Sequence, residues 1–301
     1  MPIFNKVVVF GVGLIGGSFA LALKKAGTVD EVVGVGRRPE TLQRAQALGI
    51  IDTAGDAASV AGADLVLIAA PVAQTEALLH SIAPHLQAGT IVTDAGSTKS
   101  DVVEAARRAL GSKIAQFVPG HPIAGREQNG PDAALADLYV GKKVVLTALP
   151  ENPADAVNRV AEAWKHCGAN IHQLTAAEHD AVFAAVSHLP HLLAYALVDD
   201  IASRDNASTL FQYAASGFRD FTRIAGSSPE MWRDIALANR AALLAELDAY
   251  SAQLSTLRMM LANSDGAALE KTFGRAQSAR QAWIAAIEAA EQARAFEQGG
   301  D

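Results

Sequence analysis

A glycine-rich segment near the start of the chain constrains its fold more than any other feature. Lys6–Phe10 has the composition of a buried strand, and it leads directly into Gly11–Gly17, whose sequence is GVGLIGG. Apolar residues at helical spacing follow until Gly27. The order of strand, G-x-G-x-x-G and helix is the fingerprint of a dinucleotide-binding unit. The sequence therefore predicts a Rossmann-type α/β domain at the N-terminus.

The residues of this segment each have a physical role in binding a dinucleotide. Gly11 allows a tight turn, Gly13 lets the backbone approach the pyrophosphate, and Gly16 lets the helix pack on the strand. The first helical residues, Leu14 and Ile15, offer free N–H groups at the positive end of the helix dipole. We predict that these five residues bind the cofactor. The alternative, a glycine-rich turn without a ligand, does not account for the order of strand, loop and helix.

The end of the second strand bears on which dinucleotide binds. Val32–Val35 is the next buried-strand run, and it is followed by Gly36, Arg37 and Arg38 instead of an Asp or Glu. The missing carboxylate removes repulsion against a 2′-phosphate, and two guanidinium groups can pair with that phosphate. We therefore predict NADP in preference to NAD, with Arg37 and Arg38 as cofactor-binding residues. The alternative is that both arginines are solvated residues that open the next helix.

Strands and helices alternate through the first 173 residues. Further strands are expected at residues 64–71, 90–94, 116–119, 143–147 and 170–172, and helices at residues 75–82, 100–110 and 153–166. This alternation predicts a doubly wound parallel sheet, in which ligands bind beyond the carboxyl ends of the strands. Pro71, Ser97 and His121 each fall just after such an end, so a site is expected there, with Pro71 and Ser97 beside the cofactor. Residues 1–173 are the predicted NAD(P)-binding domain.

Strand patterns stop after about Leu174, and the rest of the chain is predicted to be helical. Helices are expected at residues 176–204, 209–218, 229–263 and 266–298. One of them carries leucines at helical spacing, typical of a core or of a face that packs on a partner helix, namely Leu243, Leu247, Leu254, Leu257 and Leu261. We predict that residues 174–301 form an all-α substrate-binding and dimerisation domain, and that the protein is a homodimer.

Charge and cysteine content exclude several classes of partner. The 25 basic and 32 acidic residues give a formal net charge of −7, and no block of like charge occurs, so neither nucleic acid nor a membrane is expected as a partner. The apolar N-terminal stretch is interrupted by glycines and lacks the flanks of a signal peptide. Cys167 is the single cysteine, which rules out an internal disulfide, and we expect a cytoplasmic protein.

Five motifs in a fixed order extend over nearly the whole chain. They are GVGLIGGS at Gly11–Ser18, DAGSTK at Asp94–Lys99, GHPIAG at Gly120–Gly125, SHLPH at Ser187–His191 and GFRDFTRIA at Gly217–Ala225. Together they resemble the TyrA family of prephenate and arogenate dehydrogenases. The resemblance implies a Rossmann domain followed by a helical dimerisation domain. It also implies oxidative decarboxylation of a cyclohexadienol to 4-hydroxyphenylpyruvate or tyrosine, in tyrosine biosynthesis. Since the chain begins at the first strand and ends in a helix, we expect no fused chorismate mutase and no ACT domain.

The resemblance implies catalytic roles for two residues. His121 matches the family's general base, which takes the proton of the ring hydroxyl while hydride leaves the same carbon, and an imidazole with an ordinary pKa of about 6.5 suits that role. Ser97 matches the family serine that hydrogen-bonds this histidine and approaches the nicotinamide. Each has a structural alternative: His121 as a capping or core histidine, and Ser97 as the cap of the helix that begins near Ser100. Lys99 has no predicted role.

A dianionic substrate requires cations, and a guanidinium can hold a carboxylate through two parallel hydrogen bonds. Arg223 matches the family arginine with this role. Arg219 competes with it, although an ion pair with Asp220 would also explain Arg219. His191 matches a family pocket residue that contacts the substrate side chain, and Glu127 matches a family acidic residue at the edge of the pocket. We also predict that Trp232 closes the pocket, although a tryptophan there could equally be core, and that Ser216 binds substrate. His188 and His191 lie three residues apart, but they have no third ligand nearby, so we expect no metal site.

Two other functions are alternatives for a chain with this fingerprint. A β-hydroxyacid dehydrogenase also joins a Rossmann domain to a helical one, but it uses a helical lysine, and residues 176–204 contain none. A non-catalytic NADP-binding sensor would explain the fingerprint but would leave His121, Ser97 and Arg223 without a purpose. The choice between prephenate and arogenate, which differ by a keto or an amino group, is not decided by any residue identified in the sequence.

Overall fold

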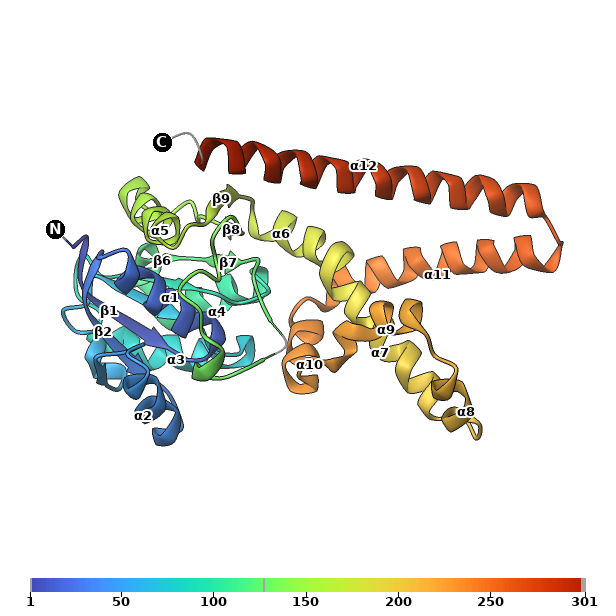
Figure 1. Ribbon diagram of the computed structural model, residues 1–301. Helices are drawn as coiled ribbons and strands as arrows, with labels where there is room; N and C mark the ends of the chain where they lie inside the picture. The colour runs from blue at the N-terminus through green and yellow to red at the C-terminus, as the bar shows by residue number, and fades with distance from the viewer. Residues whose placement is uncertain (1, 127, 299–301) are drawn as a thin grey trace. The chain divides into compact units, whose positions relative to one another are not determined.

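The computed structural model describes residues 2–126 and 128–298, and Figure 1 shows their helices and strands. The chain forms two compact units, Met1–Leu244 and Ala245–Asp301. All strands of the described residues lie in the first unit. The predicted division into residues 1–173 and 174–301 follows the change from strands to helices, which falls at the end of the last strand, Gln173. The predicted boundary therefore marks a change of secondary structure. The boundary between the compact units lies further along the chain, between Leu244 and Ala245.

Within the described residues, a six-stranded parallel sheet organises the first unit. Its strands are β1 (Phe4–Phe10), β2 (Val29–Val35), β3 (Thr53–Ala54), β4 (Leu65–Ile68), β5 (Ile91–Asp94) and β6 (Phe117–Val118). Their spatial order is β3-β2-β1-β4-β5-β6. The chain adds strands outward on one side of β1 and then, from β4 on, outward on the other side, as in a doubly wound dinucleotide-binding fold. The predicted Rossmann-type α/β fold is confirmed.

Helices cover both faces of this sheet, so each face has its own apolar core (Figure 1). They are α1 (Leu14–Lys25), α2 (Pro39–Ala47), α3 (Thr75–Ile82), α4 (Ser100–Leu110) and α5 (Ala154–His166). Successive side chains of a strand point to opposite faces. Val7 and Val9 of β1 therefore enter one core, together with Trp164 of α5. Val8 and Phe10 enter the other core, together with residues of α3 and α4. This burial on both faces explains why the strands are continuous apolar runs.

A smaller sheet carries His121. In the described residues it has three strands, β7 (Gly120–Pro122), β8 (Lys143–Leu146) and β9 (Asn170–Gln173). The strands expected at residues 143–147 and 170–172 pair here and not with the six-stranded sheet, which is a difference from the predicted single sheet. Antiparallel pairing places His121 opposite Val145. The chain crosses from β6 to β7 at Pro119, and there the N–H of Gly120 donates to the Asp94 carboxylate (3.0 Å) at the end of β5.

The helical part of the first unit differs from the predicted helices in three places. Its helices are α6 (Ala176–Phe183), α7 (Leu189–Ala202), α8 (Ala207–Gln212), α9 (Ser216–Thr222), α10 (Pro229–Ala238) and the start of α11 (Arg240–Ala262). The helix expected at residues 176–204 contains a π turn, Ala184–His188. The helix expected at residues 209–218 is two helices, because Ala215 has an extended backbone (φ −107°, ψ −168°). The helix expected at residues 229–263 is interrupted at Asn239 (φ −99°, ψ 30°).

Proline accounts for the π turn. Pro190 is in the first turn of α7, and it has no N–H to donate to the carbonyl of Val186. A proline ring would also clash with that carbonyl in a regular α-helix. The wider turn, closed by a hydrogen bond from the N–H of Leu189 to the carbonyl of Ala184, avoids both problems.

The second unit consists of most of α11 and of α12 (Gly266–Gln298). The turn between them contains Ser264 with a positive φ of 53°, and the Asp265 carboxylate accepts a hydrogen bond from the N–H of Ala268 (3.0 Å) at the start of α12. Large apolar side chains of this unit are exposed, including Leu254, Leu261, Phe273 and Trp283. Of the predicted leucine stripe, Leu243 is buried but belongs to the first unit.

The run Ala176–Ala202 is long and apolar enough to cross a membrane when judged by length and mean hydropathy (1.6) alone. Three of its polar side chains, His179, Asp180 and His188, are buried and hydrogen-bonded inside the protein. We therefore interpret the run as a structural helix of the first unit and not as a membrane span.

Candidate active site

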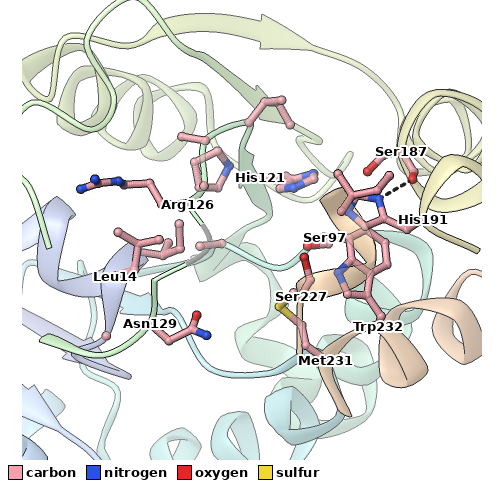
Figure 2. A pocket seen from close by; sticks show the side chains of 18 of the residues that line it. Leu14, Ser97, His121, Arg126, Asn129, Ser187, His191, Ser227, Met231 and Trp232 are labelled. Carbon is pink, nitrogen blue, oxygen red and sulfur yellow. Dashed lines mark hydrogen bonds between the residues drawn. The ribbon is translucent and has the colours of Figure 1, made fainter. Parts of the chain in front are cut away.

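A cavity of about 680 Å³ lies in the first unit, where the fingerprint loop, the strand β7 and the helical segment meet (Figure 2). Gly13, Leu14 and Ile15 line it on the Rossmann side, and Arg223 and Trp232 line it on the helical side. A smaller hollow of about 290 Å³ adjoins it beyond β4 and β5 and includes Pro71 and Ser97. Most of the predicted site residues are therefore brought together.

The fingerprint loop has the geometry that a dinucleotide requires. Gly11 has a φ of 91°, and a Cβ there would lie 2.5 Å from the carbonyl oxygen of Ala69. A Cβ on Gly16 would lie 2.2 Å from the carbonyl oxygen of Gly11, so helix and strand pack too closely for any side chain. Gly13, in contrast, faces open space, and no side chain caps the start of α1. The N–H groups at this end are open to the cavity and fit a diphosphate.

His121 lies between the fingerprint and the helical segment (Figure 2). Its Nδ1 is 2.8 Å from Nε2 of His179, and its ring packs against Phe183 with 4.9 Å between centroids. Burial lowers the pKa of His121 well below its usual value, and positive charge at His179, Lys99 or His188 would lower it further. The imidazole is therefore neutral at physiological pH and can accept a proton.

His179 and Asp180 determine which nitrogen of His121 is free to accept a proton. The Asp180 carboxylate accepts hydrogen bonds from the backbone N–H groups of Lys99 (2.8 Å) and Ser100 (2.8 Å) and lies 2.9 Å from Nδ1 of His179. Despite its burial, these hydrogen bonds lower the pKa of Asp180 to about 2, so it is ionised and can only accept. His179 thus donates from Nδ1 and accepts at Nε2 from the Nδ1–H of His121. The remaining lone pair of His121 is on Nε2.

The Asp94 carboxylate holds the loop that carries Ser97 close to β7, through a buried ion pair with Lys99 and a hydrogen bond from Gly120. The side chains of Asp94 and Lys99 are 1% and 0% exposed and form a close ion pair. Asp94 also accepts from the N–H groups of Gly96 (2.8 Å) and Gly120 (3.0 Å). Ser97 and His121 consequently line the same cavity. Nδ1 of His121 is engaged by His179, so the predicted hydrogen bond from Ser97 would have to use Nε2.

The helical end of the cavity combines an aromatic stack with a cation. His191 stacks on Trp232 with centroids 3.5 Å apart and ring planes at 18°. Its Nδ1 donates to the carbonyl of Ser187 (2.8 Å), and burial, followed by the positive charge of Arg223, keeps its pKa below the usual value. Arg223 begins a 3₁₀ turn and lines the cavity. Arg219 does not line it, and its guanidinium lies 3.6 Å from Asp220 with both side chains exposed.

Other predicted residues lie elsewhere. Ser216 begins α9, is exposed and does not line the cavity. Arg37 and Arg38 are exposed directly after β2, and Arg38 precedes the first residue of α2. Glu127 lies outside the described residues. Among residues 2–126 and 128–298, no three His, Cys, Asp or Glu side chains converge as metal ligands would.

Several residues of the site were not predicted from the sequence. His179 and Asp180 belong to no motif, and their signal was an adjacent histidine and carboxylate in the first half of a helical run that is apolar from Ala181 to Val186. Polar side chains that line the cavity without having been predicted are Arg126, Asn129, Ser187 and Ser227. They lie within or just beyond the motifs that surround His121, His191 and Arg223.

Comparison with known proteins gives consistent matches along the chain. The nucleotide-binding domain of prephenate dehydrogenase, as a family model, matches residues 19–173, and the prephenate dehydrogenase dimerization domain matches residues 175–275. A cyclohexadienyl dehydrogenase of Zymomonas mobilis is 39% identical over 287 residues, which cover 94% of this chain and 97% of that protein.

Solved structures give the same result. Prephenate dehydrogenase from Aquifex aeolicus, in complex with hydroxyphenyl propionate and NAD⁺, superposes with a TM-score of 0.87 at 35% identity, covering 92% of this chain and 97% of that one. The arogenate dehydrogenase of Synechocystis superposes with a TM-score of 0.79 at 30% identity, covering 92% and 99%. The similarity therefore extends through both the Rossmann domain and the helical segment.

Proposed function

The chain belongs to the prephenate dehydrogenase family, and from this premise we propose that it oxidises and decarboxylates prephenate, arogenate or both, with hydride transfer to NAD(P)⁺ in tyrosine biosynthesis. The observation that carries the proposal is the position of His121. Its free Nε2 belongs to a neutral imidazole in a cavity that extends from the fingerprint loop to Arg223. The same cavity offers a dinucleotide site, a base and a cation.

The reaction follows from these groups. Nε2 of His121 takes the proton of the ring hydroxyl, so that the C–O bond becomes a carbonyl as its carbon loses hydride. The bound nicotinamide supplies the hydride acceptor. The new carbonyl then receives the electron pair of the bond to the ring carboxylate, carbon dioxide leaves, and the ring becomes aromatic as a phenolate. The imidazolium of His121 can return its proton to the phenolate oxygen, which restores the base.

The residues that could bind the substrate carboxylates lie at the helical end of the cavity. We assign Arg223 to one carboxylate through a bidentate pair, and His191 and Trp232 to the substrate side chain. Trp232 has a buried Nε1–H for which no partner occurs in the described residues, so a ligand oxygen would satisfy it. Ser97 is proposed to orient His121 and to approach the nicotinamide. Glu127 and Ser216 remain predicted substrate-binding residues.

His121→Asn tests the function directly. The amide cannot accept the proton, so kcat should fall about 100-fold or more, while the Kd for the dinucleotide changes little because the fingerprint is untouched. Steady-state turnover and NADH fluorescence titration measure the two quantities. Near-normal turnover in the folded variant would remove His121 as the base. The β-hydroxyacid dehydrogenase and the NADP-binding sensor are not favoured by the comparisons.

A second proposal concerns which dinucleotide the protein prefers. NAD(P) binding follows from the nucleotide-binding domain, and we propose that NADP is preferred because Arg37 and Arg38 stand exposed beyond β2 without an acidic residue. If so, kcat/KM should be higher with NADP⁺, and Arg37→Ala/Arg38→Ala should remove this advantage while leaving kcat/KM for NAD⁺ almost unchanged. Equal kcat/KM values for both dinucleotides in the wild type would contradict the preference. Running prephenate and arogenate in parallel would also determine the substrate.

We further propose a homodimer formed through the helical domain. The match to the dimerization-domain model and the exposed apolar side chains of the second unit support it. A partner surface would bury side chains such as Phe273 and Trp283, which are 59% and 61% exposed. The buried thiol of Cys167, the single cysteine, is compatible with the reducing cytoplasm in which we expect the enzyme to act.

A further inference from the structure

The smaller hollow beside the cavity contains a carboxylate that the proposed reaction does not use. Asp234 of α10 lines this hollow, and its side chain is 9% exposed. The neighbouring Arg233, whose side chain is 61% exposed, pairs with it through Nε (2.8 Å) and Nη2 (2.7 Å). Both contacts reach the same carboxylate oxygen, Oδ1. The other oxygen, Oδ2, accepts no hydrogen bond from any residue in the ranges 2–126 and 128–298.

An ion pair between neighbours in sequence does not by itself explain a carboxylate in this position. Arg219 and Asp220 on α9 form a pair of the same spacing, and both of their side chains are exposed. Asp234 instead shares one face of α10 with Met231 and Ile235, three residues before it and one after, and all three line the hollow. A carboxylate oxygen that leaves water needs hydrogen-bond donors in its place. The hollow is where a donor for Oδ2 can enter.

The hollow lies where the nicotinamide half of a dinucleotide is expected. Its walls include Pro71, shortly after β4, and Ser97, shortly after β5. A dinucleotide crosses the sheet at the switch point, which in this strand order is between β1 and β4. The adenosine half belongs beyond β2, so the nicotinamide half belongs beyond β4 and β5.

The hollow is continuous with the cavity that contains His121. Ser97, Asn129 and Met231, which are labelled in Figure 2, line both of them. Most of the other walls of the hollow are apolar, so Asp234 stands out as a polar group in an otherwise ring-accepting site. A nicotinamide ring bound in the hollow therefore adjoins the cavity in which His121 would act.

We propose that Asp234 is a cofactor-binding residue whose Oδ2 accepts a hydrogen bond from the carboxamide N–H of the nicotinamide. The inference deepens the proposed function and rests on it for the class of cofactor. Among the described residues, Asp234 is the single carboxylate that lines the hollow. Its negative charge also favours the oxidised cofactor, because the nicotinamide ring is cationic when oxidised and neutral when reduced. A helix of the helical segment thus takes part in binding the reactive end of the dinucleotide.

A cofactor analogue tests the hydrogen bond. In 3-acetylpyridine adenine dinucleotide a methyl group replaces the carboxamide nitrogen, while the adenosine and diphosphate are those of NAD⁺. Any contribution of Arg37 and Arg38 therefore cancels when the two are compared. In calorimetric titrations of the full chain without substrate, the Kd of the analogue should be at least about tenfold higher than that of NAD⁺, because Oδ2 then lacks its donor.

Two variants separate the carboxylate from its ion pair. Asp234→Ala removes the acceptor, so the Kd values for the analogue and for NAD⁺ should come within about twofold of each other. Its Kd for ADP-ribose, which has no nicotinamide, should stay within about threefold of the wild-type value. Arg233→Ala is the matched control, because it removes the ion pair but keeps the carboxylate, and it should retain the wild-type ratio of the two Kd values.

Asp234→Asn separates the charge from the acceptor. Its amide oxygen can still accept a hydrogen bond, but the variant has no negative charge beside the ring. The ratio of the Kd for NAD⁺ to the Kd for NADH should therefore rise by about threefold or more relative to the wild type. An unchanged ratio would contradict the assigned effect of the charge.

Two further results would overturn the proposal. Equal Kd values for NAD⁺ and the acetylpyridine analogue in the wild type contradict it without any variant. An Asp234→Ala protein that binds ADP-ribose and keeps the wild-type ratio contradicts it too, because another residue would then bind the carboxamide. If the wild type bound NAD⁺ but oxidised neither prephenate nor arogenate, the proposed function would fail, and the ratio of the Kd values would still decide this inference.

Discussion

His121, His179 and Asp180 form a line of hydrogen bonds in which each nitrogen has one role. The charge of Asp180 fixes the proton of His179, and His179 fixes that of His121, which leaves Nε2 of His121 to act on the substrate. The motif around His121 made this residue predictable from sequence. His179 and Asp180 were not predictable as partners of His121. The packing of α6 beside β7 is a tertiary contact, and no local sequence pattern indicates it.

Asp180→Asn should lower kcat by roughly tenfold or more, with a smaller change in KM, because the neutral amide no longer favours the Nδ1–H tautomer of His179. The variant also loses the carboxylate that accepts from the N–H groups at the start of α4, so its stability should drop by about 1 kcal/mol. Steady-state kinetics and urea unfolding separate the two effects. Asp199→Asn, on an exposed position of α7, is the control and should alter neither quantity. An unchanged kcat in Asp180→Asn would show that the line of hydrogen bonds does not assist the base.

At the scale of elements, the Asp94–Lys99 ion pair joins three parts of the fold. Asp94 ends β5, Lys99 immediately precedes α4, and the Gly120 N–H that Asp94 holds begins β7. The strand and helix patterns of the sequence predicted β5 and α4. The separate sheet of β7, β8 and β9 was not predicted, because a short apolar run shows that a strand exists but not which strand it pairs with.

Lys99→Met should destabilise the protein by about 3–5 kcal/mol, because it leaves the Asp94 carboxylate buried without a counter-charge. Adding Asp94→Asn should restore part of this loss, since no unpaired charge then remains. Urea unfolding of the single and double variants measures both changes. Lys165→Met provides a matched control on α5, where the exposed pair with Glu162 should contribute little. A Lys99→Met protein as stable as this control would contradict the role of the ion pair.

At the scale of the whole molecule, the chain holds its site in one compact unit, and the other unit carries several exposed large apolar side chains. The cavity residues lie within Met1–Leu244, whereas Phe273 and Trp283 lie on α12 in Ala245–Asp301. Sequence periodicity predicted that both units contain helices, but it missed the interruptions at residues 184–188, at Ala215 and at Asn239. It could not place their boundary within α11, because compactness depends on contacts and not on helix pattern.

Phe273→Asp/Trp283→Asp should shift the proposed homodimer towards monomer, because two carboxylates would have to be buried at an apolar interface. Sedimentation velocity over a range of protein concentrations measures the change. The control Gln43→Asp, on an exposed position of α2, should leave the sedimentation unchanged. A wild-type protein that sediments as a monomer at every concentration would refute the homodimer.

The π turn at Ala184–His188 has a consequence for how this enzyme can evolve. A π turn amounts to an α-helix that has absorbed one extra residue. Losing one codon there, for example that of the exposed Val186, would rotate all of α7 by about 100° relative to α6. His179 would keep its angular position while His191 turned away from the cavity. This stretch should therefore accept many changes of side chain on its exposed face but hardly any insertion or deletion.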